Sequence, residues 1–548
     1  MIRHESRSAS FRRPFGAVET GGELYLAAVR PGAREMTLRL RKKGEEDSLL
    51  PMRAEEGEPG RFSVTLSLPE KGCILWYSFL SAGEETCSWQ VTVYEPHSVP
   101  EWWKNAVVYQ IFPDRFARET GWTPREPEAR RGTHRFLLRD WDTPPFYPRA
   151  EDKSVSAWPF WGGTLRGIEE KLPYLQSLGV TVLYLNPIFE ATSSHRYDTA
   201  DYTRIDPLLG TEEDFSSLCK SAAEHGMRIV LDGVFNHTGA DSVYFDKFGN
   251  YGTGEAYRSW FRFGEQYTHG YECWWDVPDL PNVEENDPSY REFLCGEDGV
   301  VRRWLRCGAS GWRLDVVDEL PDALVREIRS AMLAEKDDAL LLGEVWEDAT
   351  NKESYGELRE YFLGRELDST MHYPFRTAAL DFLTGKCDAF EAWNALWEIQ
   401  EHYPWENMLS VLNLIGSHDR ERVLTVLGGD KRALRQLTVL QYAMPGVPCI
   451  YYGDEAGMTG GSDPYNRGSF PWGAEDAELQ AHYRKLAELY REKPLLKNGA
   501  CEILYSGADV LGVRRFAEGA ETLALINRGD TDVSCCGVTV PAHGWIIQ

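Results

Sequence analysis

The chain has 548 residues, of which 42% are hydrophobic and 26% charged, and its formal net charge at pH 7 is −27. This length exceeds what one hydrophobic core usually supports, so we expect about two or three domains. The negative charge excludes binding to nucleic acid or to an anionic membrane surface, because both depend on clustered lysine and arginine. A neutral substrate fits this charge balance.

Neither the first residues nor the cysteines indicate secretion. The N-terminal segment MIRHESRSASFRRPFG lacks the apolar run of a secretory signal, and no stretch approaches the ~18 apolar residues that a membrane span needs. The eleven cysteines, an odd number without CxxC or Cys/His metal spacing, predict free thiols in a reducing compartment. We therefore expect a cytoplasmic protein, unless a signal was removed from this sequence.

The first hundred residues are short runs of alternating polarity separated by turns. Such runs are typical of antiparallel strands, so residues 1–98 are predicted to form an N-terminal β-sandwich. The runs are ELYLAAV, MTLRLR, FSVTLSL, CILWYSFL and WQVTVYEP.

From residue 99 to 492, β-rich runs that end in polar residues alternate with amphipathic segments, which is the pattern of parallel βα units. Eight such units predict an α/β fold, the (β/α)8 TIM barrel. The runs are VVYQIFP from Val107, VTVLYLNP from Val180, RIVLDGVFNH from Arg228, GWRLDVV from Gly311, ALLLGEVW from Ala339, DSTMHYPF from Asp368, MLSVLNLIGSHD from Met408 and GVPCIYYGDE from Gly446.

Helix signals lie between these runs. Thr211 and Asp214 have the spacing of a capping box, and Gly179, Gly226 and Gly308 stand where helices should end before a strand. The interval after the third run is too long for a plain βα unit, so we expect a small inserted loop domain over about 238–290. After a last helix near 477–491, the runs CEILYSG, VLGVRRF and TLALINR predict a small C-terminal β-domain over 493–548.

Polar residues gather where four predicted barrel strands end. Catalytic residues of TIM barrels lie at the C-terminal ends of the strands, so these side chains are expected to converge on one mouth. They are Asp232, Asn236 and His237 after the third run, Arg313 and Asp315 in the fourth, Glu344 in the fifth, and His418 and Asp419 in the seventh.

This set of residues suits glycosidic cleavage, in which one protonated carboxyl assists the leaving oxygen while an ionised carboxylate attacks. Arg313 lies two positions before Asp315, so both side chains share a strand face and the guanidinium would keep Asp315 ionised as the nucleophile. Glu344 follows an apolar run and lies near a negative charge, which favours the protonated form of a proton donor. The remaining residues would bind the sugar: Asp419, His237 and His418.

The segments DGVFNH, GWRLDVVDE, GEVWE and LIGSHD resemble, in order and spacing, the four signature regions of glycoside hydrolase family 13, the α-amylase family. HRYDTADY, MHYPF and YYGDEAGMTGGSDPYNR are similar to its neopullulanase, cyclomaltodextrinase and amylopullulanase branch. The resemblance implies a retaining hydrolase that cleaves α-1,4 bonds in maltodextrins, cyclodextrins, pullulan or starch. Whether α-1,6 bonds are also cleaved stays open.

The resemblance also implies residue roles. Asp315 would be the nucleophile, Glu344 the acid/base and Asp419 the stabiliser of the transition state. The substrate-binding residues would be Tyr197, His195, His237, Arg313 and His418 around the cleaved bond, Glu319 and Trp346 on the leaving-group side, and Asp463 and Arg467 on the non-reducing side.

No metal or other cofactor is expected to be required. Relatives that bind calcium have an Asn/Asp-rich loop after the first strand and an aspartate in a later GGD turn, whereas this chain has FARETGW after Asp114 and Thr164 in WGGT. Calcium prefers about six to eight oxygen ligands, and threonine supplies no anionic oxygen, so a calcium site is expected to be degraded. The stretch DVPDLP also differs from the MPKL-like stretch of cyclomaltodextrinases, which leaves the exact substrate open.

Several alternatives stay open at this stage. A transglycosylase or isomerase of the same family would use the same residues, whereas a non-catalytic sugar-binding protein should have lost one of the three carboxylates. Asp232 and Asn236 could serve only to hold loops, and His195 or His372 alone would more often be a core residue. Trp274 and Trp275 could line a groove, although packing of the inserted loop is the more common role of such residues. Relatives also suggest a homodimer formed through the N-terminal domain.

Overall fold

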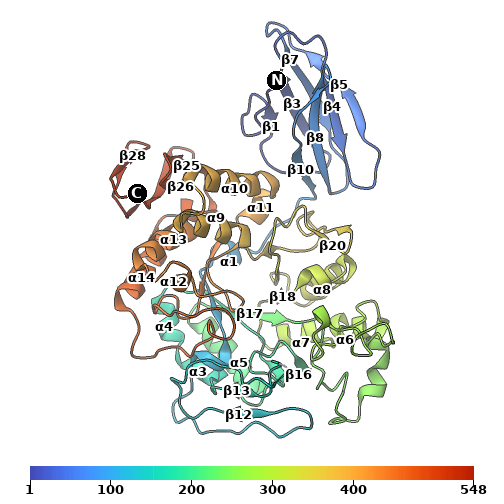
Figure 1. The fold of residues 1–548 in the computed structure, drawn as a ribbon, viewed down its shortest axis with the longest axis vertical. Helices are drawn as coiled ribbons and strands as arrows, with labels where there is room; N and C mark the ends of the chain where they lie inside the picture. Colours follow the sequence, from blue (N-terminus) through green and yellow to red (C-terminus); the bar gives the residue numbers. More distant parts are fainter. Residues whose placement is uncertain (152) are drawn as a thin grey trace.

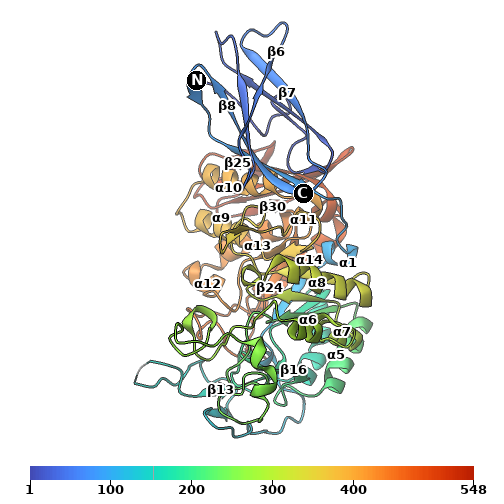
Figure 2. The same ribbon diagram turned by 90° about the vertical axis from the view of Figure 1, so that its right-hand side faces the viewer.

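The computed structural model describes residues 1–151 and 153–548, which form three regions along the chain (Figure 1). Two N-terminal sheets project from one end of a large α/β region, and Figure 2 shows the same projection from the side. A small C-terminal β-region packs beside helices α10 (Ala389–His402) and α13 (Lys431–Ala443). The predicted fold class, a TIM barrel with N-terminal and C-terminal β-regions, is confirmed.

The N-terminal region is built from two sheets whose inward-facing side chains form a separate core. All five runs predicted from the sequence are strands here. The two sheets have the orders β1-β3-β7-β6 and β2-β10-β8-β4-β5, with β9 beside β8. The strands are β1 (Arg12–Arg13), β2 (Val18–Glu19), β3 (Glu23–Val29), β4 (Thr37–Arg41), β5 (Ser48–Pro51), β6 (Arg53–Ala54), β7 (Arg61–Ser67), β8 (Cys73–Ser81), β9 (Glu84–Glu85) and β10 (Trp89–Tyr94).

A buried ion pair joins this region to the barrel. Arg12 Nη1 lies 2.6 Å from Glu401 Oε1 on α10, and the arginine side chain is wholly buried. Arg12 also donates to the carbonyl oxygens of Gly16 at 2.7 Å and Gln90 at 3.2 Å, while Ser6 Oγ donates to Glu401 Oε2 at 3.1 Å. One positive and one negative charge therefore meet in a dry joint between the two regions.

Eight parallel strands form the barrel, and they coincide with the eight predicted runs. Their order is β22-β19-β18-β17-β14-β11-β24-β23, and a parallel bridge between Met371 and Leu412 connects the two ends. The strands are β11 (Val108–Ile111), β14 (Val182–Leu185), β17 (Arg228–Gly233), β18 (Gly311–Leu314), β19 (Leu340–Gly343), β22 (Ser369–Thr370), β23 (Leu412–Leu414) and β24 (Val447–Tyr451).

Two of these strands are shorter than predicted. The sixth run begins at Asp368, but β22 has two residues, because α9 (Tyr373–Leu383) begins inside the run with a proline in its first turn. The seventh run begins at Met408, but that residue ends α11 (Trp405–Met408) and the strand starts at Leu412. The barrel is therefore held by fewer hydrogen bonds at this seam than elsewhere.

The predicted helix signals are confirmed. Thr211 and Asp214 form a capping box at the start of α5 (Glu212–Glu224). Gly179, Gly226 and Gly308 follow the ends of α4, α5 and α7 with positive φ, a conformation that other residues rarely adopt. Other helices include α2 (Pro113–Phe116), α3 (Leu165–Glu170), α4 (Leu172–Ser177), α6 (Pro288–Cys295), α7 (Val300–Arg306), α8 (Asp322–Glu335) and α14 (Ala477–Glu492).

Alternate residues of each barrel strand face opposite sides. Val182, Tyr184, Leu340 and Leu342 belong to a core inside the barrel, whereas their neighbours pack against the surrounding helices. This alternation is the ordinary period of a β-strand. It decides which side chains beyond the strand ends can point into the mouth.

The interval between β17 and β18 is long, as predicted, and the part that precedes α6 has little regular structure. Short bridges pair Phe261 with Val283, Cys273 with Pro281 and His237 with Asn282, so the segment folds back on itself. It includes two 3-10 turns, η1 (Gly254–Trp260) and η2 (Trp274–Asp276).

The C-terminal sheet has the order β25-β26-β27-β30, and the three predicted runs are its first three strands. Its strands are β25 (Ala500–Ser506), β26 (Val510–Ala517), β27 (Ala520–Asn527) and β30 (Trp545–Ile547), with a separate pair β28 (Val533–Cys535) and β29 (Val538–Val540).

All eleven cysteines are free, as predicted. Among the described residues, no helix combines the length and the apolar character needed to cross a membrane.

Candidate active site

The predicted site residues meet at the carboxyl ends of the barrel strands because they continue the inward-facing alternation. Asp232 follows Val230 by two positions, Asp315 follows Arg313, and Glu344 follows Leu342. A period of two places each of these side chains on the face that points into the barrel. Four carboxylates therefore share the mouth: Asp232, Asp315, Glu344 and Asp419, here called the carboxylate cluster.

Arg313 is the centre of this cluster. Its Nη1 donates to Asp232 Oδ1 at 2.6 Å and to Asp315 Oδ1 at 2.7 Å, and its Nη2 lies 2.9 Å from Glu344 Oε2. The guanidinium is wholly buried. One cation thus contacts three carboxylates.

The cluster carries more negative than positive charge, and this changes its proton affinity. Burial raises the pKa of Asp315 well above its usual range, and the neighbouring carboxylates Glu344, Asp232 and Asp419 raise it further, while Arg313 opposes them. Burial together with Glu344 raises the pKa of Asp419 to about 7. Arg313 acts in the predicted direction by lowering the pKa of Asp315, and the nucleophile role of Asp315 stays a prediction.

Glu344 is held at both oxygen atoms. The backbone N–H of Val316 donates to Oε2 at 2.8 Å, and Trp346 Nε1 donates to Oε1 at 3.1 Å. Trp346 in turn stacks on Tyr373 with ring centroids 4.4 Å apart. Trp346 thus lies in contact with the carboxyl group to which the resemblance assigned the acid/base role.

Tyr197 and His418 form a second polar layer beside Asp232. Tyr197 O–H donates to Asp232 Oδ2 at 2.8 Å, and its oxygen lies 2.5 Å from His418 Nε2. Gln110 Nε2 donates to His418 Nδ1 at 2.9 Å, which assigns the ring proton to Nε2. Burial, Arg467 and Arg313 lower the pKa of His418, so its ring is neutral and donates from Nε2.

His195 and His237 lie on either side of this layer. His195 Nδ1 accepts from the backbone N–H of Tyr197 at 3.1 Å, and its ring meets Trp158 edge to face at 4.9 Å. Burial lowers the pKa of His237 to about 4, so this ring is also neutral. Among the described residues, no group pairs with the buried Nε2 of His237 or with Nε1 of Trp274, whose ring lies 5.6 Å away. Both nitrogen atoms are free to bind a ligand.

Arg467 and Asp463 approach the cluster from the opposite side. Arg467 Nη2 lies 3.5 Å from Asp419 Oδ1, and its Nη1 lies 2.9 Å from Asp463 Oδ1. Tyr147 O–H also donates to Asp463 at 3.2 Å. Asp419 keeps 28% of its side chain exposed, so the cluster opens to solvent here.

Glu319 lies farther out, between two exposed aromatic side chains. Trp275 Nε1 donates to Glu319 Oε1 at 3.2 Å, Tyr355 O–H donates to Glu319 Oε2, and each ring is 77% exposed. We call these three residues the aromatic rim. The interpretation that Trp275 packs the inserted loop is wrong, because the ring faces solvent. Glu319 is a predicted site residue, and the hydrogen bonds that it accepts come from this rim rather than from the carboxylate cluster.

Sequence reasoning missed two residues that orient the site. Gln110 binds His418, and Asn186 Nδ2 donates to Tyr197 at 2.8 Å. Each continues the inward alternation of its strand, Gln110 after Val108 and Asn186 after Tyr184. The same period that located Asp315 could have found them.

The loop after Asp114, where a calcium site is expected to be degraded, holds a guanidinium. Arg118 donates to the carbonyl oxygens of Trp161 at 2.9 Å, Arg139 at 3.0 Å and Leu138 at 2.8 Å. Thr164 caps α3 by accepting from the Gly167 N–H at 2.9 Å, and its hydroxyl donates to Glu119. Asp114 accepts from the backbone N–H groups of Trp161 and Gly162. These carbonyl, hydroxyl and carboxylate oxygens therefore take part in hydrogen bonds within the chain.

Comparison with known proteins supports the geometry. Residues 110–493 match the family described as "Alpha amylase, catalytic domain". An amylopullulanase from Thermoanaerobacter thermohydrosulfuricus is 33% identical over 632 positions, which cover 96% of this chain and 42% of that protein. A cyclomaltodextrinase from Geobacillus thermopakistaniensis is 35% identical over 460 positions, covering 82% of this chain and 73% of that protein.

A solved structure shares the architecture. The cyclic α-maltosyl-(1→6)-maltose hydrolase from Arthrobacter globiformis superposes with a TM-score of 0.73 at 31% identity and covers 82% of this chain and 99% of its own. The present chain spans about a third to a half of the length of the curated amylopullulanases it matches.

Proposed function

We propose that this chain, which belongs to glycoside hydrolase family 13, the α-amylase family, hydrolyses α-glucosidic bonds with retention of configuration. The observation that carries the proposal is the contact of one buried guanidinium, Arg313, with both Asp315 and Glu344. Adjacent nitrogen atoms of one group hold the two carboxyls close together. This favours the short separation of retaining enzymes, about 5–5.5 Å, over the wider separation that admits a water between the carboxyls.

In the first step, Asp315 attacks the anomeric carbon while Glu344 gives its proton to the glycosidic oxygen, and the C–O bond to the leaving sugar breaks. In the second step, Glu344 takes a proton from water, the water oxygen bonds to the anomeric carbon, and Asp315 leaves. Asp315 Oδ1 accepts from Arg313, while none of the described residues donates to Oδ2, which is the oxygen that attacks.

The proton for the first step comes from the carboxylate cluster, because burial and neighbouring negative charges favour the protonated form of a carboxyl group. Burial and neighbouring carboxylates raise the pKa of Asp315, and burial with Glu344 raises the pKa of Asp419 to about 7, so these carboxyl groups hold a proton more tightly than exposed ones do. As positive charge develops at the anomeric carbon, it stabilises Asp315 as an anion, while Glu344 passes its proton to the glycosidic oxygen. Asp419 then binds the ring hydroxyls in the distorted sugar.

The neutral rings bind the sugar at the cleaved bond. His418 presents Nε2–H toward Asp419 at 3.2 Å, and the unpaired Nε2 of His237 can bind a hydroxyl. The subsite around the cleaved bond is also lined by Tyr197, Arg313 and His195. On its non-reducing side, the sugar is bound by Asp463 and Arg467. Neutral, hydroxyl-rich α-glucans suit such a site, and they suit a chain with a net charge of −27.

Maltodextrins, cyclodextrins, pullulan and starch are the substrates we propose, with cleavage of α-1,4 bonds and, in branched substrates, α-1,6 bonds. The names of the relatives, amylopullulanase and cyclomaltodextrinase, support this range. Trp346 beside Glu344 and the aromatic rim at Glu319 would bind the sugars on the leaving-group side.

Transglycosylation is a second candidate, favoured by the aromatic rim. Two rings that are each 77% exposed offer an apolar surface to an incoming sugar, which would compete with water for the intermediate. Product analysis at high maltose concentration distinguishes the two. Longer or rearranged sugars indicate transfer, and glucose alone indicates hydrolysis.

Calcium is not required for this activity in our proposal. Arg118 already supplies a positive charge to three carbonyl oxygens, which supports independence from a metal at that loop. Prolonged treatment with a strong calcium chelator should leave both the turnover and the melting temperature unchanged. A chelator-induced loss of either that calcium restores would contradict this proposal.

We also propose that the chain forms a homodimer through residues 1–98. The edge strand β5 exposes Leu49 and unpaired backbone groups, which can extend a sheet into a second copy. Light scattering at micromolar concentration tests the dimer, and a monomer would contradict it.

We further propose that the protein resides in a reducing compartment, the cytoplasm. The free state of all eleven cysteines supports this location, which localisation of the tagged protein in its source cells would test.

The proposed function is tested by product profiles on maltotriose, β-cyclodextrin, pullulan and soluble starch. The wild-type chain should release glucose, maltose or panose, and Asp315→Asn and Glu344→Gln should release none at a comparable rate. NMR of the first product should show the α-anomer. A β-anomer would exclude retention, and no turnover of any substrate would make a binding role the better explanation.

A further inference from the structure

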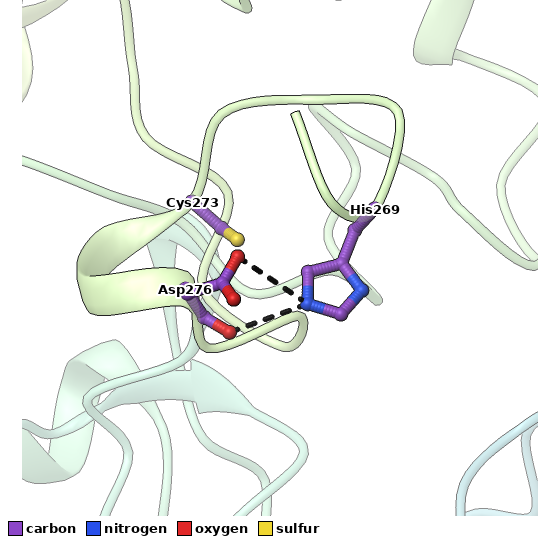
Figure 3. A group of neighbouring side chains, drawn as sticks. All are labelled: His269, Cys273 and Asp276. Atoms are coloured by element: carbon purple, nitrogen blue, oxygen red, sulfur yellow. Dashed lines mark hydrogen bonds and ion pairs between the residues drawn. The ribbon is translucent and has the colours of Figure 1, made fainter. Parts of the chain in front are cut away.

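We propose that a second, unassigned site lies in the long loop between β17 and β18, where His269, Cys273 and Asp276 bind one divalent transition-metal cation such as Zn²⁺. Figure 3 shows the three side chains turned toward one another at the surface of the loop. One ligand atom of each lies within 4.8 Å of the corresponding atoms of the others. We call these residues the loop triad.

The distances within the loop triad suit a tetrahedral ion. Ligands at about 2.0–2.1 Å from Zn²⁺, separated by the tetrahedral angle, stand about 3.4 Å from each other. His269 Nε2 lies 3.6 Å from Asp276 Oδ1. A thiolate binds at a longer distance of about 2.3 Å. Cys273 Sγ lies within 4.8 Å of the other two ligand atoms, so the three side chains must draw closer together around the ion.

The backbone holds the three residues in this arrangement. Phe263 pairs with Tyr271 and Cys273 pairs with Pro281, so the chain from His269 to Asp276 runs through a tight reversal. Trp275 and Asp276 both have positive φ, at 49° and 60°, which is rare for residues other than glycine. This left-handed pair returns the Asp276 side chain and its carbonyl oxygen, 3.3 Å from His269 Nε2, to the side of Cys273.

The chemistry of the ligand atoms selects the class of metal. Thiolate and imidazole are soft or borderline ligands that suit Zn²⁺, Co²⁺ and Cd²⁺, whereas Ca²⁺ and Mg²⁺ need several oxygen ligands. On binding, the thiol gives its proton to solvent, and the metal takes its place on sulfur. Water completes the fourth position, because the triad lies at the surface.

This site would act on the aromatic rim, a consequence that rests on the proposed function. Trp275, between two of the ligands, donates to Glu319, and Trp274 lies against His237. A bound metal would fix the strained turn and therefore the position of both rings. We expect a lower KM for long α-glucans with metal and little change in kcat for short ones.

Co²⁺ binding to the full chain tests the metal site without any assay of activity. Metal-free wild type should bind one equivalent with the near-ultraviolet charge-transfer band of a cobalt thiolate. Cys273→Ser should abolish that band, and His269→Ala should weaken binding by at least about 10- to 100-fold, since the loss of even an outer-shell partner costs that much. Cys87→Ser, at an exposed cysteine outside the triad, is the matched control and should bind as wild type does.

Two results would overturn the proposal. One is a wild-type chain that shows no thiolate band, which would leave His269 and Asp276 as a simple ion pair. The other is a band that Cys273→Ser retains, which would place the metal at another cysteine. Failure of the proposed hydrolysis would change neither result, so the two proposals can fail separately.

Discussion

Two buried arginines hold the molecule together in opposite ways. Arg12 meets the single carboxylate of Glu401 at the joint between the N-terminal sheets and the barrel. Arg313 meets Asp232, Asp315 and Glu344 at the barrel mouth. The first pair is balanced in charge, and the second group is not.

This difference in charge balance distinguishes an ion pair with a structural role, at Arg12, from a group of charges at the proposed catalytic residues, around Arg313. A balanced buried pair gains little beyond satisfying its own charges, and removal of one partner leaves the other uncompensated. At the barrel mouth, burial and then the neighbouring Glu344 raise the pKa of Asp419 to about 7, a shift that is typical of groups used in acid/base chemistry. Charge imbalance around a buried arginine is thus a better sign of a reactive site than burial alone.

The largest expected effect is the loss of turnover in Asp315→Asn. Removal of a nucleophile should lower kcat by about 10⁴-fold or more, which corresponds to roughly 5.5 kcal/mol of activation free energy. Steady-state kinetics on maltotriose measures the loss. The variant should melt no lower than wild type, because it removes excess negative charge from the cluster. Turnover within tenfold of wild type would remove Asp315 from the nucleophile role.

Arg12→Met tests the balanced side of the comparison. It leaves the buried Glu401 with only the more distant and partly exposed Arg7 as a cation, so the free energy of unfolding should fall by about 3–5 kcal/mol. Turnover per folded molecule should stay unchanged, since Arg12 has no contact with the cluster. Denaturant titration followed by circular dichroism measures the loss.

The double variant Arg12→Met/Glu401→Leu is the control for this experiment. Replacing both charges with apolar groups should restore most of the stability. If Arg12→Met lost turnover while remaining folded, the contact between the N-terminal sheets and the barrel would take part in catalysis, and the Arg12–Glu401 pair would not be purely structural.

A third prediction concerns how stability depends on pH at the unbalanced cluster. Asp419 has a raised pKa of about 7 in the folded chain. The folded state therefore binds the proton more tightly than the unfolded state, and the stability that protonation contributes is lost as pH rises from near 4 through 7. Asp419→Asn should be more stable than wild type at about pH 8, on the order of 2 kcal/mol, and equal to it at about pH 4.

Denaturant midpoints of the two chains across this range provide the measurement. Glu401→Gln serves as the contrast, since its pair is balanced and should gain no stability at high pH. An advantage of Asp419→Asn that grew as the pH fell would contradict the sign.

The smallest effect is expected at the edge of the joint. Arg7 Nε lies 3.7 Å from Glu401 Oε2 and keeps 26% of its side chain exposed, so it forms a weak pair. Arg7→Ala should lower the free energy of unfolding by less than about 1 kcal/mol. A loss as large as that of Arg12→Met would mean that Glu401 depends on two cations rather than one.

The barrel and most of its site could be predicted because the responsible signals are local. A period of two along each strand determines which side chains face the mouth, and this was enough to bring Asp315 and Glu344 together. Gln110 was missed although it follows the same rule, because one glutamine inside an apolar strand has no distinctive pattern. The strand at 369–370 was predicted too long because proline and helix signals beyond it were read as strand.

Other features depend on contacts that no local pattern contains. Arg12 and Glu401 are 389 residues apart, so neither neighbourhood indicates the other. The exposure of Trp275 depends on the left-handed turn of an irregular loop. The raised pKa of Asp315 depends first on burial and then on the carboxylates that meet it in space, whereas the neighbouring Arg313 in the sequence indicates the opposite direction.

The seam between β22 and β23 has a consequence for motion. A single bridge, Met371 to Leu412, joins the two ends of the sheet, with the N–H of His372 and the hydroxyl of Ser369 as its nearby support. Amide protons on both sides of this seam should exchange with deuterated solvent before those of β14 and β17. Because β23 leads directly to Asp419, local opening of the barrel hydrogen bonds would begin next to the residue that is proposed to bind the distorted sugar.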